Sequence, residues 1–221
     1  MIVPVAELEI VNDALSGFAE ALEVPVHVLA LLLLLALALE AGRGAVEAWR
    51  RMRPGRERLV DLALNALRDP RQGRELSRRA PTAIAGRAVL QMSTAVGTGD
   101  PHGAEPALAD FELGVQRRLD RTRMLVRAGP AVGLMGTLIP LAPGLAALGR
   151  GDIAGLAADL KTAFAATVVG LLVGTASFAL TLWRTRVYTE DLAALERAVA
   201  IAVPAAPPHE RVTAAVGEHQ A

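Results

Sequence analysis

The chain has 221 residues, enough for one ordinary globular domain or a small membrane protein. Its 23 basic and 23 acidic residues cancel, so the bulk charge gives no case for nucleic-acid binding. The absence of cysteine excludes disulfide scaffolds, thiol nucleophiles and cysteine-ligated metals, and the four scattered histidines form no zinc pattern. Apolar residues make up 52% of the sequence and aromatic residues only 3%, and this aliphatic mass lies in three blocks, which indicates an all-α membrane protein.

The first block follows an acidic segment, residues 1–23, which has no Lys or Arg. Residues 24–39 carry no charge and would span about 24 Å as a helix, and their neighbours extend the block towards the ~30 Å of a bilayer core. The alternative is a cleaved signal peptide, which needs a positively charged segment that residues 1–23 do not provide. We therefore expect an extracytoplasmic segment at 1–23 and transmembrane helix 1 at 24–42.

The second and third blocks, residues 128–149 and 162–183, each run for 22 residues without a charged side chain. Both are long enough for a membrane-spanning helix. The alternative for each is a buried core helix of a soluble domain, which the Leu-rich first block argues against. We expect transmembrane helices 2 and 3 here, joined by a short extracytoplasmic connection at 150–161.

The arginines set the expected topology. Sixteen arginines lie between Arg43 and Arg123, and the segment 150–161 has two basic residues. By the positive-inside rule the N-terminus lies outside, the 43–127 loop lies in the cytoplasm and the C-terminus lies inside. These arginines either only signal topology or also contact lipid headgroups.

The cytoplasmic segments are expected to be helical. Five apolar residues share one face of a helix after Pro54, and a second helix is expected from Pro81 to about Thr94. A further helix from Glu105 is expected to run without interruption into the second span, and the third span to continue as a cytoplasmic helix, 184–203. The tail, 204–221, is expected to be disordered. The five apolar residues are Leu59, Leu62, Ala63, Ala66 and Leu67.

Small and hydroxyl residues follow helical spacing inside the second and third spans. In the third span, steps of three and four residues place a small-residue stripe on one helical face. Such a stripe can line an ion path or can serve only for tight helix packing. The stripe consists of Thr167, Gly170, Gly174, Ser177 and Thr181; the second span contributes Gly129, Gly133, Gly136 and Thr137.

Neither of these two spans contains Asp, Glu, Lys, Arg or His. A proton relay needs a titratable group at membrane depth, and His27, near the outer end of the first span, is the one candidate that the sequence suggests. Proton movement would therefore need an acid from another polypeptide. The sequence offers no paired acids, nucleophile triad or metal cluster for an enzyme, and no cofactor is expected.

Two short motifs carry a family resemblance. The second span contains G-L-x-G-T and the third A-F-x-x-T-x-x-G-L, and with these the two spans resemble the MotA/TolQ/ExbB proton channel family. The three-span layout is similar to that of its TolQ and ExbB branch. The matching residues are Gly133, Leu134, Gly136 and Thr137, followed by Ala163, Phe164, Thr167, Gly170 and Leu171.

The resemblance implies a homopentamer around a central pore, working with a single-span ExbD/TolR/MotB-like partner that carries a membrane aspartate. It implies pore-facing hydroxyls at Thr137 and Thr167. Thr162 stands where ExbB-like members have a Glu, and the segment after Thr137 is also not typical of that branch. Ser177 completes the candidate ion-path residues, while the glycines at 129, 133, 136, 170 and 174 are the candidate packing residues.

The leading hypothesis is thus a pore-forming stator subunit of an ion-driven motor in the bacterial inner membrane. It would conduct H⁺ or Na⁺ together with its partner and convert the flux into mechanical work. The alternative is a membrane scaffold that conducts nothing and uses the glycines and hydroxyls only to pack its helices.

Overall fold

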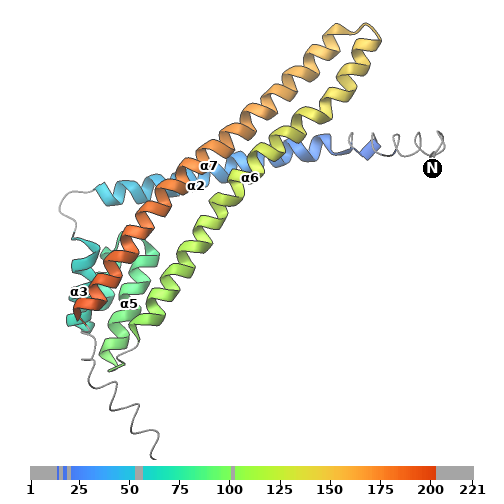
Figure 1. The fold of residues 1–221 in the computed structure, drawn as a ribbon. Coiled ribbons are helices and arrows are strands. Elements are labelled where there is room, and N and C mark those ends of the chain that lie inside the picture. The colour runs from blue at the N-terminus through green and yellow to red at the C-terminus, as the bar shows by residue number, and fades with distance from the viewer. Residues whose placement is uncertain (1–13, 15–16, 19–20, 53–56, 101–102, 203–221) are drawn as a thin grey trace, which may run out of the picture. The chain divides into compact units, whose positions relative to one another are not determined.

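The structure, a computed structural model, describes the chain except for residues 1–13, 15–16, 19–20, 53–56, 101–102 and 203–221 (Figure 1). Most of the predicted N-terminal segment and the predicted disordered tail therefore lie outside the described residues. Within the described part every regular element is a helix. The α-helices are α2 (Glu23–Met52), α3 (Leu59–Arg68), α4 (Gly73–Arg79), α5 (Ala83–Gly97), α6 (Ala104–Gly149) and α7 (Ile153–Ala202), with a 3₁₀ helix, η1, at Pro70–Gln72.

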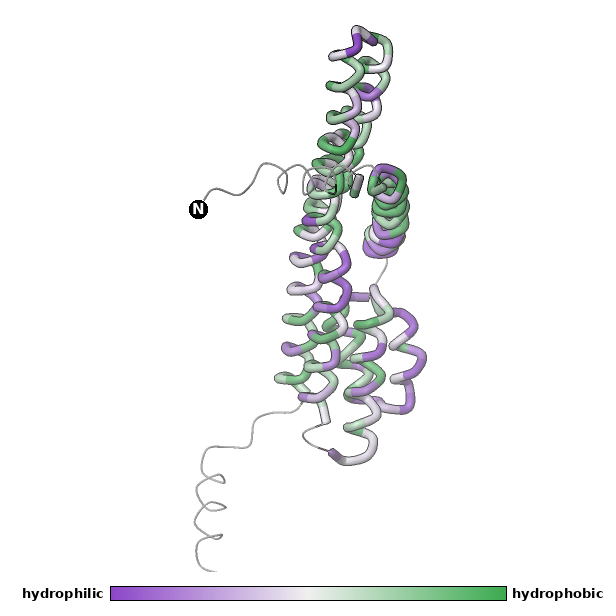
Figure 2. Tube along the Cα trace, turned by 90° about the vertical axis from the view of Figure 1, so that its right-hand side faces the viewer, coloured by the Kyte–Doolittle hydropathy of each residue, from purple (hydrophilic) through white to green (hydrophobic). Residues whose placement is uncertain are grey.

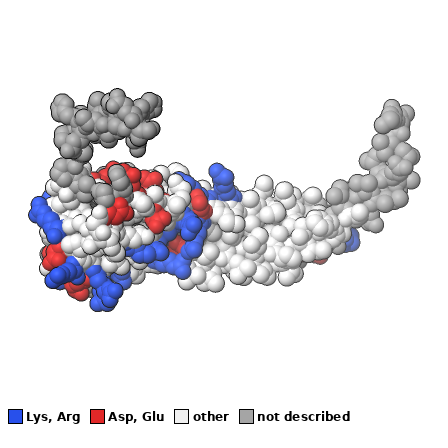
Figure 3. Space-filling model, turned by 90° about the horizontal axis from the view of Figure 1, so that it is seen from below, with Lys and Arg blue, Asp and Glu red and all other residues white. Residues whose placement is uncertain are grey.

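Three of these helices, α2, α6 and α7, are long and apolar enough to cross a membrane. They contain the three predicted spans, and Figure 2 shows long stretches of hydrophobic residues along them. Figure 3 shows a wide area of surface without Lys, Arg, Asp or Glu. Many large apolar side chains on these helices are exposed, among them Leu35, Leu138 and Phe164. Such a surface belongs in a membrane, where lipid or protein covers it.

The chain forms two compact units, and the first contains residues 1–45 and 118–184. Its apolar contacts are few: Val26 and Ala30 of α2 pack with Val132 of α6, and Leu37 packs with Leu125 and Val173. Residues 26, 30, 33 and 37 follow steps of four and three, so one face of α2 supplies these contacts. Glycine and polar contacts, described below, add to this small core.

The second unit contains residues 46–117 and 185–221. Its larger hydrophobic core joins α3, α4 and α5 to the ends of α6 and α7, with fully buried Leu62, Val89 and Leu195 near its centre. All five residues of the predicted apolar face after Pro54 are buried in α3, so this prediction is confirmed. The face forms because every turn of α3 places an apolar side chain on the same side.

The helices of the second unit differ from expectation in two places. The helix expected from Pro81 begins at Ala83, because Thr82 is extended and its hydroxyl oxygen accepts a hydrogen bond from the Ala85 amide at 3.1 Å. Between the two expected helices the structure also has η1 and, after it, the short helix α4, which were not predicted. Asp69 Oδ1 accepts from the Arg71 amide at 3.2 Å, which starts η1.

The two longest helices are nearly continuous in sequence. α6 runs from Ala104 to Gly149 without interruption, with three prolines beyond its first turn, and residues 150–152 alone separate it from α7. Gly151 has a φ of +77°, and Asp152 Oδ1 accepts from the Gly155 amide at 2.8 Å, so the turn is short and capped. Most of the predicted 150–161 connection is therefore the first part of α7.

Candidate ion path

The helices α6 and α7 meet through glycines in the first unit. A β-carbon added at Gly129 would lie 2.7 Å from the Gly170 carbonyl oxygen and 2.8 Å from the Gly174 amide nitrogen. A β-carbon at Gly170 would lie 2.6 Å from the Gly129 carbonyl oxygen and 2.7 Å from the Gly133 Cα. Because the nearest atoms belong to backbones, neither helix can make room by turning a side chain. The glycines thus let two helix backbones touch.

The glycine contact extends along both helices. A β-carbon at Gly136 would lie 2.6 Å from the Ala166 β-carbon, and one at Gly174 would lie 2.9 Å from Pro130 side-chain atoms. We call the five residues Gly129, Gly133, Gly136, Gly170 and Gly174 the glycine contact. All the candidate packing residues therefore lie between α6 and α7.

The small-residue stripe of α7 faces the interior of the first unit. Gly170 and Gly174 are buried, Ser177 is completely buried, and Thr167 and Thr181 are half-buried. On the opposite face Val168 and Phe178 are exposed. Thr137 of α6 is half-buried too, whereas Thr162 is exposed near the start of α7.

The threonine hydroxyls bond to their own helices. Thr137 donates to the Leu134 carbonyl at 2.7 Å, Thr167 to the Ala163 carbonyl at 3.3 Å and Thr162 to the Ala158 carbonyl at 3.2 Å. Each hydroxyl has one hydrogen, so these bonds leave the oxygen lone pairs as acceptors. Ser177 differs, because its Oγ finds no hydrogen-bond partner among the described residues.

A buried ion pair joins α2 to α7 inside the first unit. Arg184 Nη1 lies 2.7 Å from Glu40 Oε2, and Arg184 Nη2 donates to the Glu40 backbone carbonyl at 3.2 Å. Arg43 binds the other carboxylate oxygen of Glu40, also at 2.7 Å. The Arg184 side chain is 3% exposed and the Glu40 side chain 10%. The structure thus brings an acid of the first span against the face of α7 that carries the stripe.

The sequence reading missed this pair, because charges at the ends of apolar blocks served only as topology signals. A usable signal was present in the spacing. Arg184 follows Thr181 by three residues and so continues the small-residue stripe, and Glu40 follows Leu37 by three and continues the buried face of α2. His27, the titratable candidate from the sequence, donates from Nδ1 to the Glu23 carbonyl at 2.7 Å instead.

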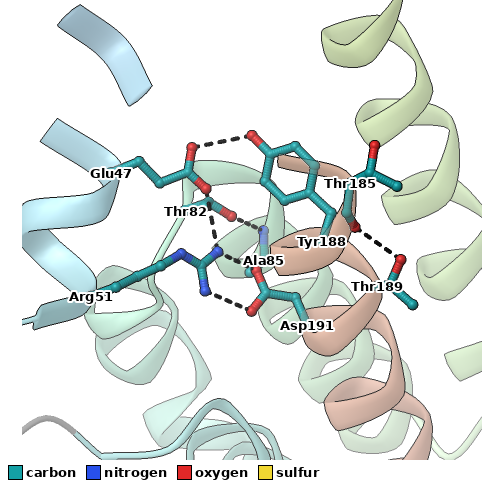
Figure 4. Close-up of polar contacts among 8 residues, drawn as sticks. All are labelled: Glu47, Arg51, Thr82, Ala85, Thr185, Tyr188, Thr189 and Asp191. Carbon is teal, nitrogen blue, oxygen red and sulfur yellow. Dashed lines mark hydrogen bonds and ion pairs between the residues drawn. The ribbon is translucent and has the colours of Figure 1, made fainter. Parts of the chain in front are cut away.

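The second unit has its own polar cluster, drawn in Figure 4. Arg51 of α2 binds both carboxylate oxygens of Asp191 of α7, at 2.9 and 2.6 Å, and also binds Glu47 at 3.2 Å. The Tyr188 hydroxyl donates to Glu47 at 3.1 Å. Burial alone would lower the pKa of Arg51, but the hydrogen bonds and charges of Asp191 and Glu47 outweigh it and raise that pKa above its ordinary value. This cluster fastens α2 to α7 in the second unit.

Comparison with known proteins gives a family match for α6 and most of α7. No curated protein and no solved structure is similar enough to this chain to count as a match. The family model of the MotA/TolQ/ExbB proton channel family matches residues 104–196. The matched range holds α6 and most of α7, with the glycine contact and the small-residue stripe. The predicted resemblance is confirmed over residues 104–196, the range in which the chain matches the MotA/TolQ/ExbB proton channel family.

Proposed function

We propose that the chain is the pore-forming stator subunit of an ion-motive-force-driven motor. In this proposal it conducts protons or sodium ions and converts the flux into mechanical work together with a single-span, ExbD/TolR/MotB-like partner. The observation that carries the proposal is the range of the family match, which covers Thr137, Thr167 and the glycine contact between α6 and α7. Members of this family are channel and energy-transducing proteins rather than enzymes.

The proposed assembly is a pentamer around a central pore in the bacterial inner membrane, with the N-terminus outside and the C-terminus inside. Exposed apolar side chains of α6 and α7, such as Leu138 and Val168, supply surface for neighbouring subunits, the partner or lipid. The partner's aspartate would provide the titratable group that residues 128–149 and 162–183 do not contain. Arginines such as Arg50 and Arg121 would contact lipid headgroups.

The scaffold alternative has one specific observation in its favour. The hydroxyls of Thr137, Thr162 and Thr167 all donate to carbonyls of their own helices, as purely structural threonines do. If packing is their whole role, their oxygens need no further ligand. The two functions differ in whether these oxygens face a moving ion.

Ion flux into proteoliposomes separates the two functions. The chain is purified alone and together with single-span proteins encoded beside it, and H⁺ and Na⁺ entry is recorded under an imposed membrane potential. The stator function predicts flux that requires a partner and collapses in Thr137→Val and Thr167→Val. Absence of flux from a stable, complete complex would establish the scaffold instead.

A further inference from the structure

Two polar atoms on the buried face of α7 have no hydrogen-bond partner among the described residues: Ser177 Oγ and Arg184 Nε. Ser177 is 0% exposed and Arg184 3%. An unsatisfied buried donor or acceptor costs about 1–3 kcal/mol, and in proteins such groups usually hold an internal water. Thr181 lies between them on the same face and donates to the Ser177 carbonyl at 2.7 Å. The buried polar side of α7 therefore suits a short row of waters.

The polar side of α7 ends at a buried acid that binds an exposed arginine. Arg184 holds the Glu40 carboxylate at 2.7 Å, and the other oxygen of that carboxylate binds Arg43 at 2.7 Å. The Arg43 side chain is 62% exposed. Polar groups thus continue from the completely buried Ser177, through Arg184 and Glu40, to an exposed side chain.

We propose that Glu40 is the chain's own proton-exchange group, at the end of the ion path where α2 meets Arg184. The inference rests on the proposed function and adds a residue and an ion to it. A proton carried by water beside Ser177 and Thr181 forms an O–H bond with a Glu40 carboxylate oxygen while the O–H bond in the donor water breaks. The reverse step passes the proton to solvent water beside Arg43, and no electron changes hands.

The free oxygen ligands around Glu40 are too few for a sodium ion, although the two guanidinium charges oppose the binding of either cation. A sodium site needs several oxygen ligands and uncompensated negative charge. Here the single carboxylate already binds two guanidinium groups, those of Arg43 and Arg184. The geometry therefore assigns H⁺ as the ion that passes this point.

The competing account is that Glu40 and Arg184 only fasten α2 to α7. The chain offers a matched control for this account in Glu47, a second buried carboxylate on α2. Glu47 also binds an arginine and a side chain of α7, but in the second unit. Glu40→Gln and Glu47→Gln thus remove comparable buried charges, and of the two only Glu40 binds Arg184, the arginine that continues the stripe.

The experiment uses the complex of this chain with its single-span partner in proteoliposomes that hold a pH-sensitive dye. A potassium diffusion potential drives entry in Na⁺-free buffer. We expect Glu40→Gln to lower H⁺ flux about a hundredfold, the lower range of what a positioned proton-transfer group contributes. Glu40→Asp should restore part of the flux, and Glu47→Gln should stay close to wild type. Thermal stability and oligomer size of each variant are measured in parallel.

The outcomes separate this inference from the proposed function. Wild-type complex without flux contradicts the proposed function itself. Wild-type flux that Glu40→Gln leaves unchanged, that both Gln variants lower equally, or that requires Na⁺ overturns the inference and leaves the proposed function standing.

A second variant decides the question if Glu40→Gln does not assemble. Ser177→Ala removes a buried hydroxyl that has no described partner, so a purely structural role predicts equal or higher stability with unchanged flux. The proton path predicts equal or higher stability with reduced flux. Unchanged flux in Ser177→Ala overturns the inference.

Discussion

Arg184 and Glu40 are 144 positions apart in the chain, yet one guanidinium nitrogen of Arg184 reaches the Glu40 carboxylate at 2.7 Å. A second nitrogen reaches the Glu40 backbone carbonyl at 3.2 Å. The arginine therefore binds both the side chain and the main chain of a single residue. This double contact fixes where α2 lies along α7 in the first unit more closely than the sparse apolar contacts around Leu37 can.

The glycine contact should tolerate no side chain. Gly170→Ala places a β-carbon 2.6 Å from a backbone oxygen of α6, and overpacking of this kind costs about 1–3 kcal/mol. We expect a lower unfolding temperature of the purified protein in detergent, measured by circular dichroism. Gly42→Ala is the control, because a β-carbon there meets nothing within 4 Å and alanine favours the helix. Equal behaviour of the two variants would contradict the close approach.

The effect of replacing a threonine on ion flux should depend on the face of α7 on which that threonine lies. We expect Thr167→Val to reduce partner-dependent H⁺ or Na⁺ flux in proteoliposomes by about tenfold or more, because the loss of one oxygen ligand or relay removes on the order of 1.4 kcal/mol. Thr175→Val serves as the control, since Thr175 is exposed on another face of α7 and bonds to its own helix in the same way. Equal losses in both variants would point to a general effect on the helix.

Asp191 should be the residue through which the polar cluster stabilises the second unit. Asp191→Leu leaves Arg51 with half of its carboxylate partners in a largely buried site, and we expect a loss of about 2 kcal/mol in unfolding free energy. Glu190→Ala breaks only the exposed pair with Arg186 and should change stability by less than about 0.5 kcal/mol. Thermal unfolding of both variants in detergent checks this, and similar values for the two would show that burial adds nothing.

The same cluster should withstand alkaline pH. The pKa of Arg51 is raised in the folded state, so its contribution is fully present below its unfolded value and is lost only as the pH rises through the higher folded value. Between about pH 7 and about pH 10 the stability difference between wild type and Asp191→Leu should therefore stay constant. A difference that shrinks across this range would mean that Arg51 loses its charge early.

The core of the second unit should respond to truncation as a packed interior does. Leu62 is completely buried, and Leu62→Ala should cost about 2–5 kcal/mol. Leu113→Ala truncates the same side chain where it is 51% exposed, and we expect a far smaller change. Chemical denaturation of the two variants gives the comparison. A small effect at Leu62 would contradict the tight packing of α3 in this core.

Much of this fold could be predicted from local sequence patterns. The apolar face of α3 was predictable because all five of its buried residues are apolar and correctly spaced. The three long helices were predictable because uncharged runs of this length have few other uses. The short helix α4 was not, since its only buried positions are Gly73 and Leu76, too few to form a periodic signal.

The candidate site could be predicted only in part, because it depends on contacts between segments that lie far apart in the sequence. The α7 stripe could be read from spacing, but its burial against α6 depends on glycines of both helices, and its polar end depends on Glu40 from a third. Charges such as Glu40 and Arg184 also have a simpler explanation, as flanks of membrane spans, that no local pattern can exclude. Pairing of this kind is fixed only when the crossing point of two helices is known.

The backbone contact at Gly129, Gly133 and Gly170 also limits how the protein can move. A screw motion of one residue, about 1.5 Å along the helix with a rotation of about 100°, would bring the side chain of Val132 or Leu134 to the place of Gly133, where only a hydrogen atom now fits. Helices α6 and α7 are therefore coupled at this point and travel as one rigid pair. If the proposed motor function holds, any displacement that ion entry drives should occur at the outer surfaces of the pair, where exposed leucine and phenylalanine side chains can slide past a neighbour.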